Sequence, residues 1–265
     1  MRNRASLLIV ALLVVPVVAV AQRAEAVETG FLDRSVSLGG RIYRYQVYVP
    51  STYTPRQRWP VILFLHGAGE RGVDGYLQTQ VGLGAAIRQN AARVPAIVVF
   101  PQSTPDSTWT GTLASVALAA LDRTMIDYAT DPARVYLTGM SMGGHGTWYI
   151  AYRNPTRFAA LAVICGGISP EVWTMGAYGR VVPIDSGEAF SALARQLRHV
   201  PTWIFHGEVD PLVPVEESRK VFAALQAVGA PAQYTEIPGT GHNSWDPAYG
   251  SPKFWAWLLA QRREP

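Results

Sequence analysis

The sequence predicts an α/β protein with a mostly parallel sheet covered by helices on both faces. Short runs that are apolar throughout, such as residues 61–65 and 159–165, alternate with segments of helical apolar spacing, such as residues 113–128. Strands that are apolar on both sides are typical of parallel sheets buried between helices. Several of these runs end in glycine-rich turns, and ligands bind at the carboxyl edge of such sheets.

Length and composition are consistent with one such domain. Of the 265 residues, 49% are hydrophobic and 16% charged, which is enough for one sizeable core. The net charge of +4, from 23 Lys+Arg against 19 Asp+Glu, is not clustered, so a nucleic-acid partner is not indicated. Cys165 is the only cysteine and lies in an apolar run, so we expect an inert core thiol and no internal disulfide.

The first 26 residues have the pattern of a secretory signal peptide. Arg2 and Arg4 precede an apolar run over residues 7–20, and small residues place the cleavage site after Ala21 or Ala26. A membrane anchor is the alternative, but the uncharged run is short for a spanning helix. We therefore expect a secreted or periplasmic protein, without stable membrane association after cleavage, whose single catalytic domain is residues 27–265.

The elements follow in order along the chain. Residues 35–38 and 43–49 alternate like the strands of a hairpin around Gly39-Gly40. The remaining expected strands are residues 61–65, 97–100, 135–137, 159–165, 203–205 and 234–237, and the expected helices are residues 113–128, 147–152, 215–228 and 254–261. Residues 168–199 lack a clear core strand and are expected to form a small excursion over the site, carrying Trp173, Met175 and Tyr178.

The run Gly139-Met140-Ser141-Met142-Gly143 lies between an expected strand and an expected helix. In that context Gly-x-Ser-x-Gly indicates a nucleophile elbow, a sharp turn that presents the serine above the sheet edge. Side chains at Gly139 or Gly143 would crowd the turn. The alternative is a serine in an ordinary glycine-rich turn, and the flanking elements favour Ser141 as a nucleophile.

A serine nucleophile needs a base, and the base needs an orienting acid, in the chain order Ser, Asp or Glu, His. His242 follows the last expected strand in Pro238-Gly239-Thr240-Gly241-His242, so we expect it to be the base. Asp210, before Pro211 and after the penultimate strand, is the expected acid, with Glu208 as the alternative.

The four other histidines are less suitable as a base. His66 is expected to shape the glycine loop after its strand, and His145 is too near Ser141 in sequence. His199 enters a strand at the opposite edge, and His206 precedes the best acid.

The turn His66-Gly67-Ala68-Gly69 follows another strand and fits the second half of an oxyanion hole. Glycines allow a backbone amide to face the reacting carbonyl, so the backbone N–H groups of Met142 and Ala68 are the expected donors. An ordinary glycine-rich turn is the alternative.

Together these motifs resemble the α/β-hydrolase superfamily. The motifs are His66-Gly67-Ala68-Gly69-Glu70-Arg71-Gly72, the elbow through Gly144, His206-Gly207-Glu208-Val209-Asp210, and Gly241-His242-Asn243-Ser244-Trp245. They are most similar to the secreted carboxylesterase/phospholipase-like and predicted-peptidase group, which borders on feruloyl esterases and polyhydroxyalkanoate depolymerases. The resemblance runs from about Tyr43 to the C-terminus and implies a serine hydrolase. The single cysteine departs from the disulfide-bearing depolymerases, and an ion pair between Glu70 and Arg71 would fix the loop.

The resemblance does not identify a substrate, because this fold hosts many chemistries. Trp109, Gln102, Trp245 and His66 are the candidate substrate contacts, and Tyr249 also follows the base, although aromatic side chains there could equally pack the loops. We expect hydrolysis of small or polymeric carboxylic esters through an acyl-enzyme. A peptidase with the same triad, a feruloyl or polyester depolymerase and a non-catalytic binding protein are the alternatives. No cofactor is implied, and the histidines lack the spacing of metal ligands.

Overall fold

The computed structural model describes residues 27–169, 179–184 and 188–264. The expected signal peptide over residues 1–26 lies outside this part, and so do Trp173, Met175 and Tyr178 of the expected excursion. Among the residues that the structure describes, each helix is too short or too polar to span a lipid bilayer.

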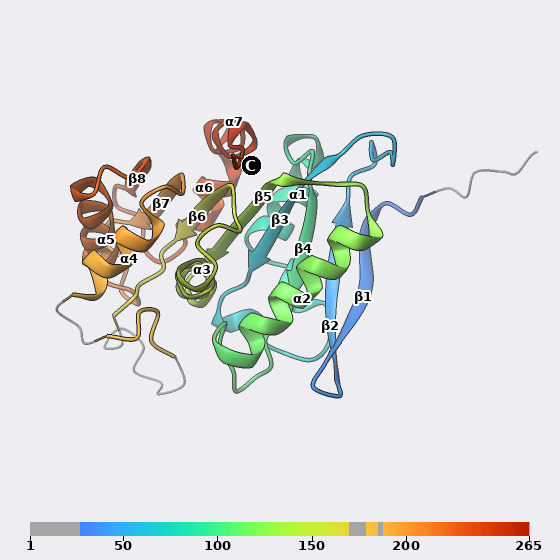
Figure 1. Ribbon diagram of the computed structural model, residues 1–265, viewed down its shortest axis with the longest axis horizontal. Coiled ribbons are helices and arrows are strands. Elements are labelled where there is room, and N and C mark those ends of the chain that lie inside the picture. Colours follow the sequence, from blue (N-terminus) through green and yellow to red (C-terminus); the bar gives the residue numbers. More distant parts are fainter. Residues whose placement is uncertain (1–26, 170–178, 185–187, 265) are drawn as a thin grey trace, which may run out of the picture.

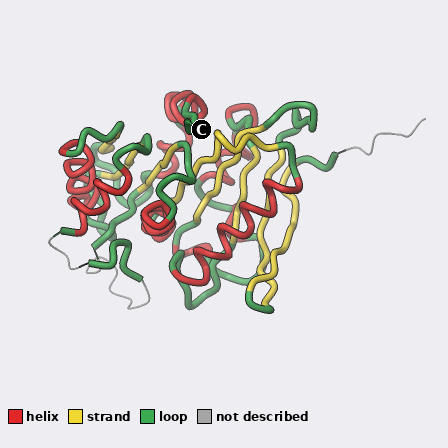
Figure 2. The backbone as a smooth tube through the Cα atoms, viewed as in Figure 1, coloured by secondary structure: helices red, strands yellow, loops and turns green. Residues whose placement is uncertain are grey.

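An eight-stranded sheet has the order β1-β2-β4-β3-β5-β6-β7-β8 (Figures 1 and 2). The β1/β2 and β2/β4 pairs are antiparallel. The six neighbouring strands β4, β3, β5, β6, β7 and β8 run parallel to one another. The strands are β1 Gly30–Leu38, β2 Arg41–Val49, β3 Trp59–Leu65, β4 Ile97–Pro101, β5 Thr130–Met140, β6 Ala160–Ile164, β7 Thr202–Gly207 and β8 Ala232–Ile237. The predicted mostly parallel sheet is confirmed.

Helices cover both faces of the sheet because the parallel strands alternate between two apolar cores. Leu63 and Leu65 of β3 point into one core, and Ile62 and Phe64 into the other. The first core receives α2 Gly111–Asp127, α3 Met142–Arg153, α4 Ala189–Leu197 and α5 Val215–Ala227. The second receives α1 Leu83–Gln89, α6 Trp245–Gly250 and α7 Pro252–Ala260. Figure 1 shows α2 crossing the sheet on the near face.

The strand order places a crevice between the loops that follow β3 and β5. The chain leaves β3 toward β4 on one side, whereas it leaves β5 toward β6 on the other. Neighbouring parallel strands whose connections diverge in this way form the usual ligand site of an open α/β sheet. The turn after β3 begins at His66, and the turn after β5 contains Ser141.

The expected excursion over residues 168–199 contains a packed helix where it is described. Helix α4 contacts α3 and α5, and Leu193, Ala194 and Leu197 are buried there. Its polar residues face outward on an amphipathic helix, which explains why its apolar positions are interrupted in sequence. The described part therefore belongs to the body of the domain.

Candidate active site

Ser141 sits in a strained turn between β5 and α3. Its φ of 54° and ψ of −118° lie outside the regions that non-glycine residues prefer. A Cβ at Gly143 would overlap the carbonyl oxygen of Leu65, and a Cβ at Gly139 would overlap that of Gly143. The glycine spacing therefore permits this close approach of backbones, as the sequence predicted for an elbow.

The structure brings Ser141, His242 and Asp210 together from three separate loops. His242 Nε2 lies 2.9 Å from Ser141 Oγ, and His242 Nδ1 lies 2.7 Å from Asp210 Oδ2. With Nδ1–H donating to the carboxylate, Nε2 is free to accept the serine hydroxyl proton. This is the hydrogen-bond order of a nucleophile, a base and an orienting acid.

The Asp210 carboxylate is buried but receives several donors. Its Oδ1 accepts the backbone N–H groups of Leu212 at 2.8 Å and Val213 at 3.0 Å, and its Oδ2 also lies 3.2 Å from His206 Nε2. Burial alone would raise the pKa of Asp210, but hydrogen bonds from His206, His242 and these amides hold it well below its usual range. Asp210 is therefore a carboxylate, the form that can stabilise a positive charge on His242.

Glu208, the alternative acid, is exposed and turned toward another loop. Its Oε2 accepts the backbone N–H of Gly239 at 2.8 Å. This contact joins the loop after β7 to the loop that carries His242. In this geometry Asp210, and not Glu208, is the carboxylate beside His242.

The two expected oxyanion donors lie at helix starts beside Ser141. Met142 is the first residue of α3, and Ala68 is the first residue of a 3₁₀ turn, Ala68–Glu70. Amides in the first turn of a helix have no intrahelical acceptor, so they can serve a developing oxyanion.

A small pocket of about 260 Å³ opens above Ser141. The residues that line it come from the turns after β3 and β5 and from the loops that carry the acid and the base: Gly67, Ala68, Gly69, Glu70, Met140, Ser141, Leu212, His242 and Trp245. Of the four predicted substrate contacts, Trp245 lines this pocket. Its ring packs edge-on against the His242 ring, with 5.4 Å between the ring centroids.

The other three predicted substrate contacts are corrected by their burial. Trp109 is fully buried and its Nε1–H donates to the His66 carbonyl at 2.9 Å. Gln102, 4% exposed, accepts the Gly75 amide and donates to the Glu70 carbonyl. Both side chains hydrogen-bond to the loop after β3, and neither lines the pocket above Ser141. The sequence order of a loop does not reveal which of its side chains point inward.

His66 is likewise a structural residue of this loop. Its Nδ1–H donates to the Gly67 carbonyl at 2.6 Å, and its Nε2 accepts the Ser103 amide at 2.9 Å. Burial lowers the pKa of His66 to about 4. The expectation that His66 shapes the glycine loop agrees with these contacts, whereas its predicted contact with substrate does not.

Two further residues singled out in the sequence lie near the pocket: Glu70, expected to pair with Arg71, and Tyr249, which follows the base. Burial raises the pKa of Glu70, and within the described residues its Oε2 is buried without a hydrogen-bond partner. Tyr249 is buried and its hydroxyl pairs with Thr138 Oγ1 at 2.9 Å, so this aromatic ring packs the core.

Cys165 lies close to Asp210 and His242. Its Sγ, a carboxylate oxygen of Asp210 and a ring nitrogen of His242 all lie within 4.8 Å of one another. Burial raises the pKa of its thiol to about 12, and the other two side chains already bond to each other. A metal ion would have to remove the thiol proton and separate the histidine from its acid, so this set is a poor metal site.

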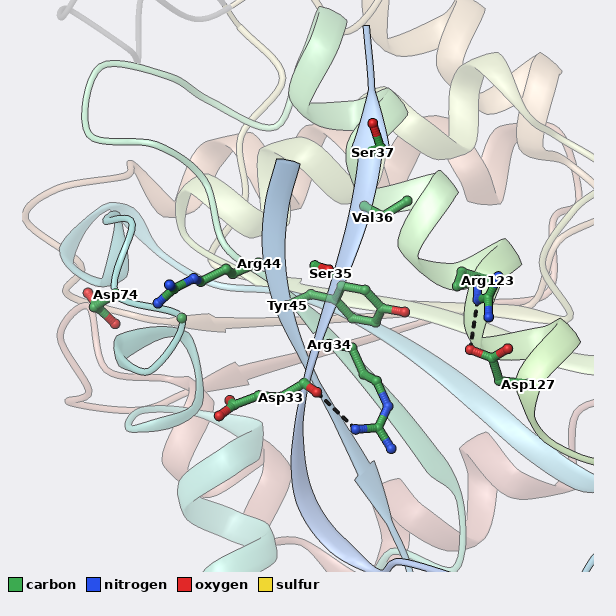
Figure 3. Close-up of a pocket in the computed structure, with 11 residues that line it drawn as sticks. Asp33, Arg34, Ser35, Val36, Ser37, Arg44, Tyr45, Asp74, Arg123 and Asp127 are labelled. Atoms are coloured by element: carbon green, nitrogen blue, oxygen red, sulfur yellow. Dashed lines mark hydrogen bonds and ion pairs between the residues drawn. The ribbon is translucent and has the colours of Figure 1, made fainter. Parts of the chain in front are cut away.

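A larger hollow of about 780 Å³ lies at the edge strand β1, away from Ser141 (Figure 3). Figure 3 shows Arg44 and Asp74 on one side of β1, and Arg123 and Asp127 on the other. Arg123 Nε pairs with Asp127 Oδ2 at 2.9 Å. No histidine is among the described residues that line the hollow, so it does not have the serine–histidine–aspartate arrangement found at the smaller pocket.

The sheet, its helices and the serine turn define the α/β-hydrolase fold. The chain belongs to the esterase family, whose model matches residues 35–257. It is 26% identical over 252 residues to a poly(3-hydroxyoctanoate) depolymerase from Pseudomonas fluorescens, which covers 88% of this chain and 84% of that protein.

Two structures and a further relative extend this comparison. A thermostable esterase is 32% identical with a TM-score of 0.73, over 88% of this chain and 63% of that chain. A ferulic acid esterase from Anaeromyces mucronatus shares the fold with a TM-score of 0.64 at 16% identity, over 90% and 93% of the two chains. An uncharacterized secreted protein from Arthroderma benhamiae is 27% identical over 69% of this chain, which spans only 21% of that protein.

Proposed function

We propose that this protein is a secreted serine hydrolase that cleaves carboxylic esters through Ser141, His242 and Asp210. The observation that supports it most directly is the continuous pair of hydrogen bonds from Ser141 to His242 and from His242 to Asp210. The esterase family and the named relatives support an ester as the bond that is cleaved.

In the proposed reaction Ser141 Oγ attacks the ester carbonyl carbon while His242 Nε2 takes the hydroxyl proton. The carbonyl oxygen becomes an oxyanion, which the amides of Met142 and Ala68 stabilise. The C–O bond to the alcohol then breaks, and His242 gives its proton to the departing oxygen. Water attacks the acyl-enzyme by the same steps, His242 taking a water proton and returning it to Ser141 as the carboxylic acid leaves.

Export is the second part of the proposal. The Arg2/Arg4 start and the apolar run over residues 7–20 fit a signal peptide, and one relative is described as secreted. Small or polymeric esters are the proposed substrates, because the pocket opens to the surface and a relative is a polyester depolymerase.

Active-site labelling with a fluorescent phosphonate tests the nucleophile directly. We expect labelling at Ser141, hydrolysis of p-nitrophenyl acetate, and loss of both in a folded Ser141→Ala variant. Labelling at another residue, or wild-type rates in the variant, would refute the assignment. Faster turnover of an aminoacyl anilide than of the esters would favour the peptidase alternative, and neither activity would favour a binding protein.

A further inference from the structure

His206 lies behind the proposed acid and is fully buried. It belongs to β7, the strand that precedes Asp210, and its side chain and that of Asp210 have no exposed surface. His206 precedes Asp210 in the chain, so the order Ser, Asp or Glu, His does not predict a catalytic role for it. The structure shows that the turn after β7 folds back, so a residue four positions before the acid contacts it.

The hydrogen bonds of His206 define its role. Nε2 donates to the Val213 carbonyl oxygen at 2.9 Å and lies 3.2 Å from Asp210 Oδ2, so the same polar N–H also acts on that carboxylate. Nδ1 lies 2.7 Å from Ser218 Oγ, whose hydroxyl can donate to it. Since the carbonyl can only accept, the hydrogen must be on Nε2, and the ring faces Asp210 as a donor.

Besides the Val213 carbonyl and Asp210, the neighbouring strand β8 places a carboxylate beside His206. Glu236 stands opposite His206 on β8, but its carboxylate is held by Arg219 and the Tyr234 hydroxyl. Ser218 lies in the first turns of α5 and is 1% exposed. The ring is therefore fixed from β7 and α5 at once.

We propose that His206 is a positioning residue for the catalytic acid, an inference that rests on the proposed triad. It holds Asp210 Oδ2 where the remaining lone pair faces His242 Nδ1, and it ties Asp210 and Val213, the two ends of the acid loop, to the same ring. By sharing the negative charge on Oδ2, it also limits how strongly Asp210 stabilises the protonated form of His242.

The sign of the expected effect follows from that charge sharing. Without the His206 donor, the negative charge of Asp210 acts on His242 alone and stabilises its protonated form more strongly. His242 is then protonated, and unable to act as a base, up to a higher pH. The acid limb of the kcat/KM profile therefore moves upward, by about one unit for the loss of one hydrogen bond to a charged group. Because a misplaced acid also orients His242 less well, we expect kcat to fall about 10- to 100-fold with little change in KM.

The experiment compares His206→Leu, which removes the donor, with His206→Gln, which can place an amide N–H near the Nε2 position. We expect the upward shift and the lower kcat in His206→Leu and recovery of both toward wild type in His206→Gln. His199→Leu, at an exposed histidine bonded to the Pro155 carbonyl, is the control and should keep the wild-type profile.

A folded His206→Leu with the wild-type profile would overturn the proposal, and so would a fall in kcat without a shift of the limb. If His206→Leu does not fold, Ser218→Ala decides, because it frees Nδ1 and weakens the fixed orientation; a smaller shift in the same direction supports the proposal, and none refutes it. Wild-type hydrolysis with phosphonate labelling at Ser141 separates these outcomes from failure of the proposed function.

Discussion

Two histidine–tryptophan pairs lie at the same edge of the sheet and differ in what surrounds them. His66 packs edge-on against Trp109 at 4.9 Å, and His242 against Trp245 at 5.4 Å. The first pair is fully buried, whereas the side chain of His242 is 16% exposed beside a pocket. Both pairs follow strands, so sequence position alone does not distinguish them.

The partners of each ring explain the difference. His66 bonds to a backbone carbonyl and a backbone amide, which fix one neutral tautomer and occupy both nitrogens. His242 bonds to a hydroxyl and a carboxylate, a proton source and a stabilising charge. A histidine held by backbone groups maintains a loop, and one held by side chains of these two kinds can transfer a proton.

Removing each ring in turn tests this contrast with the largest expected effect. His242→Ala should lower kcat by about 10⁴-fold or more, because no other described side chain is hydrogen-bonded to Ser141 Oγ. His66→Gln should mainly lower stability and leave phosphonate labelling of Ser141 intact. Steady-state kinetics beside thermal unfolding would check both, and equal losses of kcat in two folded variants would contradict the contrast.

The acid is tested by two carboxylates from one loop. Asp210→Asn should lower kcat by about 10⁴-fold, because an amide does not stabilise the imidazolium and can favour the wrong tautomer. Glu208→Gln is the matched control and should remain within a few-fold of wild type, since Glu208 bonds to the Gly239 amide at the exposed rim. A crippled Glu208→Gln with a mild Asp210→Asn would reverse the assignment.

The pH dependence of folding sharpens the description of His66. Its folded pKa of about 4 lies below the ordinary 6.5, so the unfolded chain binds a proton that the folded chain does not between these values. The stability that His66 contributes is complete above pH 6.5 and is lost as the pH falls toward 4, by up to about 3 kcal/mol. Urea unfolding at pH 7 and pH 4.5 should show a smaller loss in His66→Gln than in wild type. An equal loss in both proteins would assign the effect to other groups.

The sequence predicted the fold because parallel strands buried on both faces are apolar throughout, as in residues 61–65. Their bounds were less certain, since β5 begins at Thr130 and runs through Pro132, where no apolar run is visible. The short helices α1, α4 and α6 were not predicted, because so few residues carry little periodicity, whereas α7, of nine residues, was predicted from its nearly continuous apolar run.

The site likewise has residues that the sequence predicted and contacts that it did not. Ser141, Asp210 and His242 follow from motif and chain order, and the structure places them in contact. The inward direction of Trp109 and Gln102, and the contact of His206 with Asp210, depend on how the loops fold back. The His-Gly-x-x-Asp spacing was the only sequence signal for the last of these.

The smallest expected effect concerns acyl-chain length and the two tryptophans. The pocket of about 260 Å³ is bounded by Met140, Leu212 and Trp245, so we expect kcat/KM to peak at acyl chains of roughly two to four carbons, without activation by micelles.

Trp245→Ala should lengthen the preferred chain, with a gain of about tenfold on a substrate two methylenes longer, at about 0.8 kcal/mol per methylene buried. Trp109→Ala should lower stability without changing this preference, because its ring lies beneath the loop. A p-nitrophenyl ester series below and above micelle formation measures both. A wild-type maximum at long acyl chains, or a jump in rate with aggregated substrate, would contradict this prediction. Either result would mean that His242 and Trp245 border an acyl groove larger than this pocket, since a boundary formed by Trp245 cannot admit such chains.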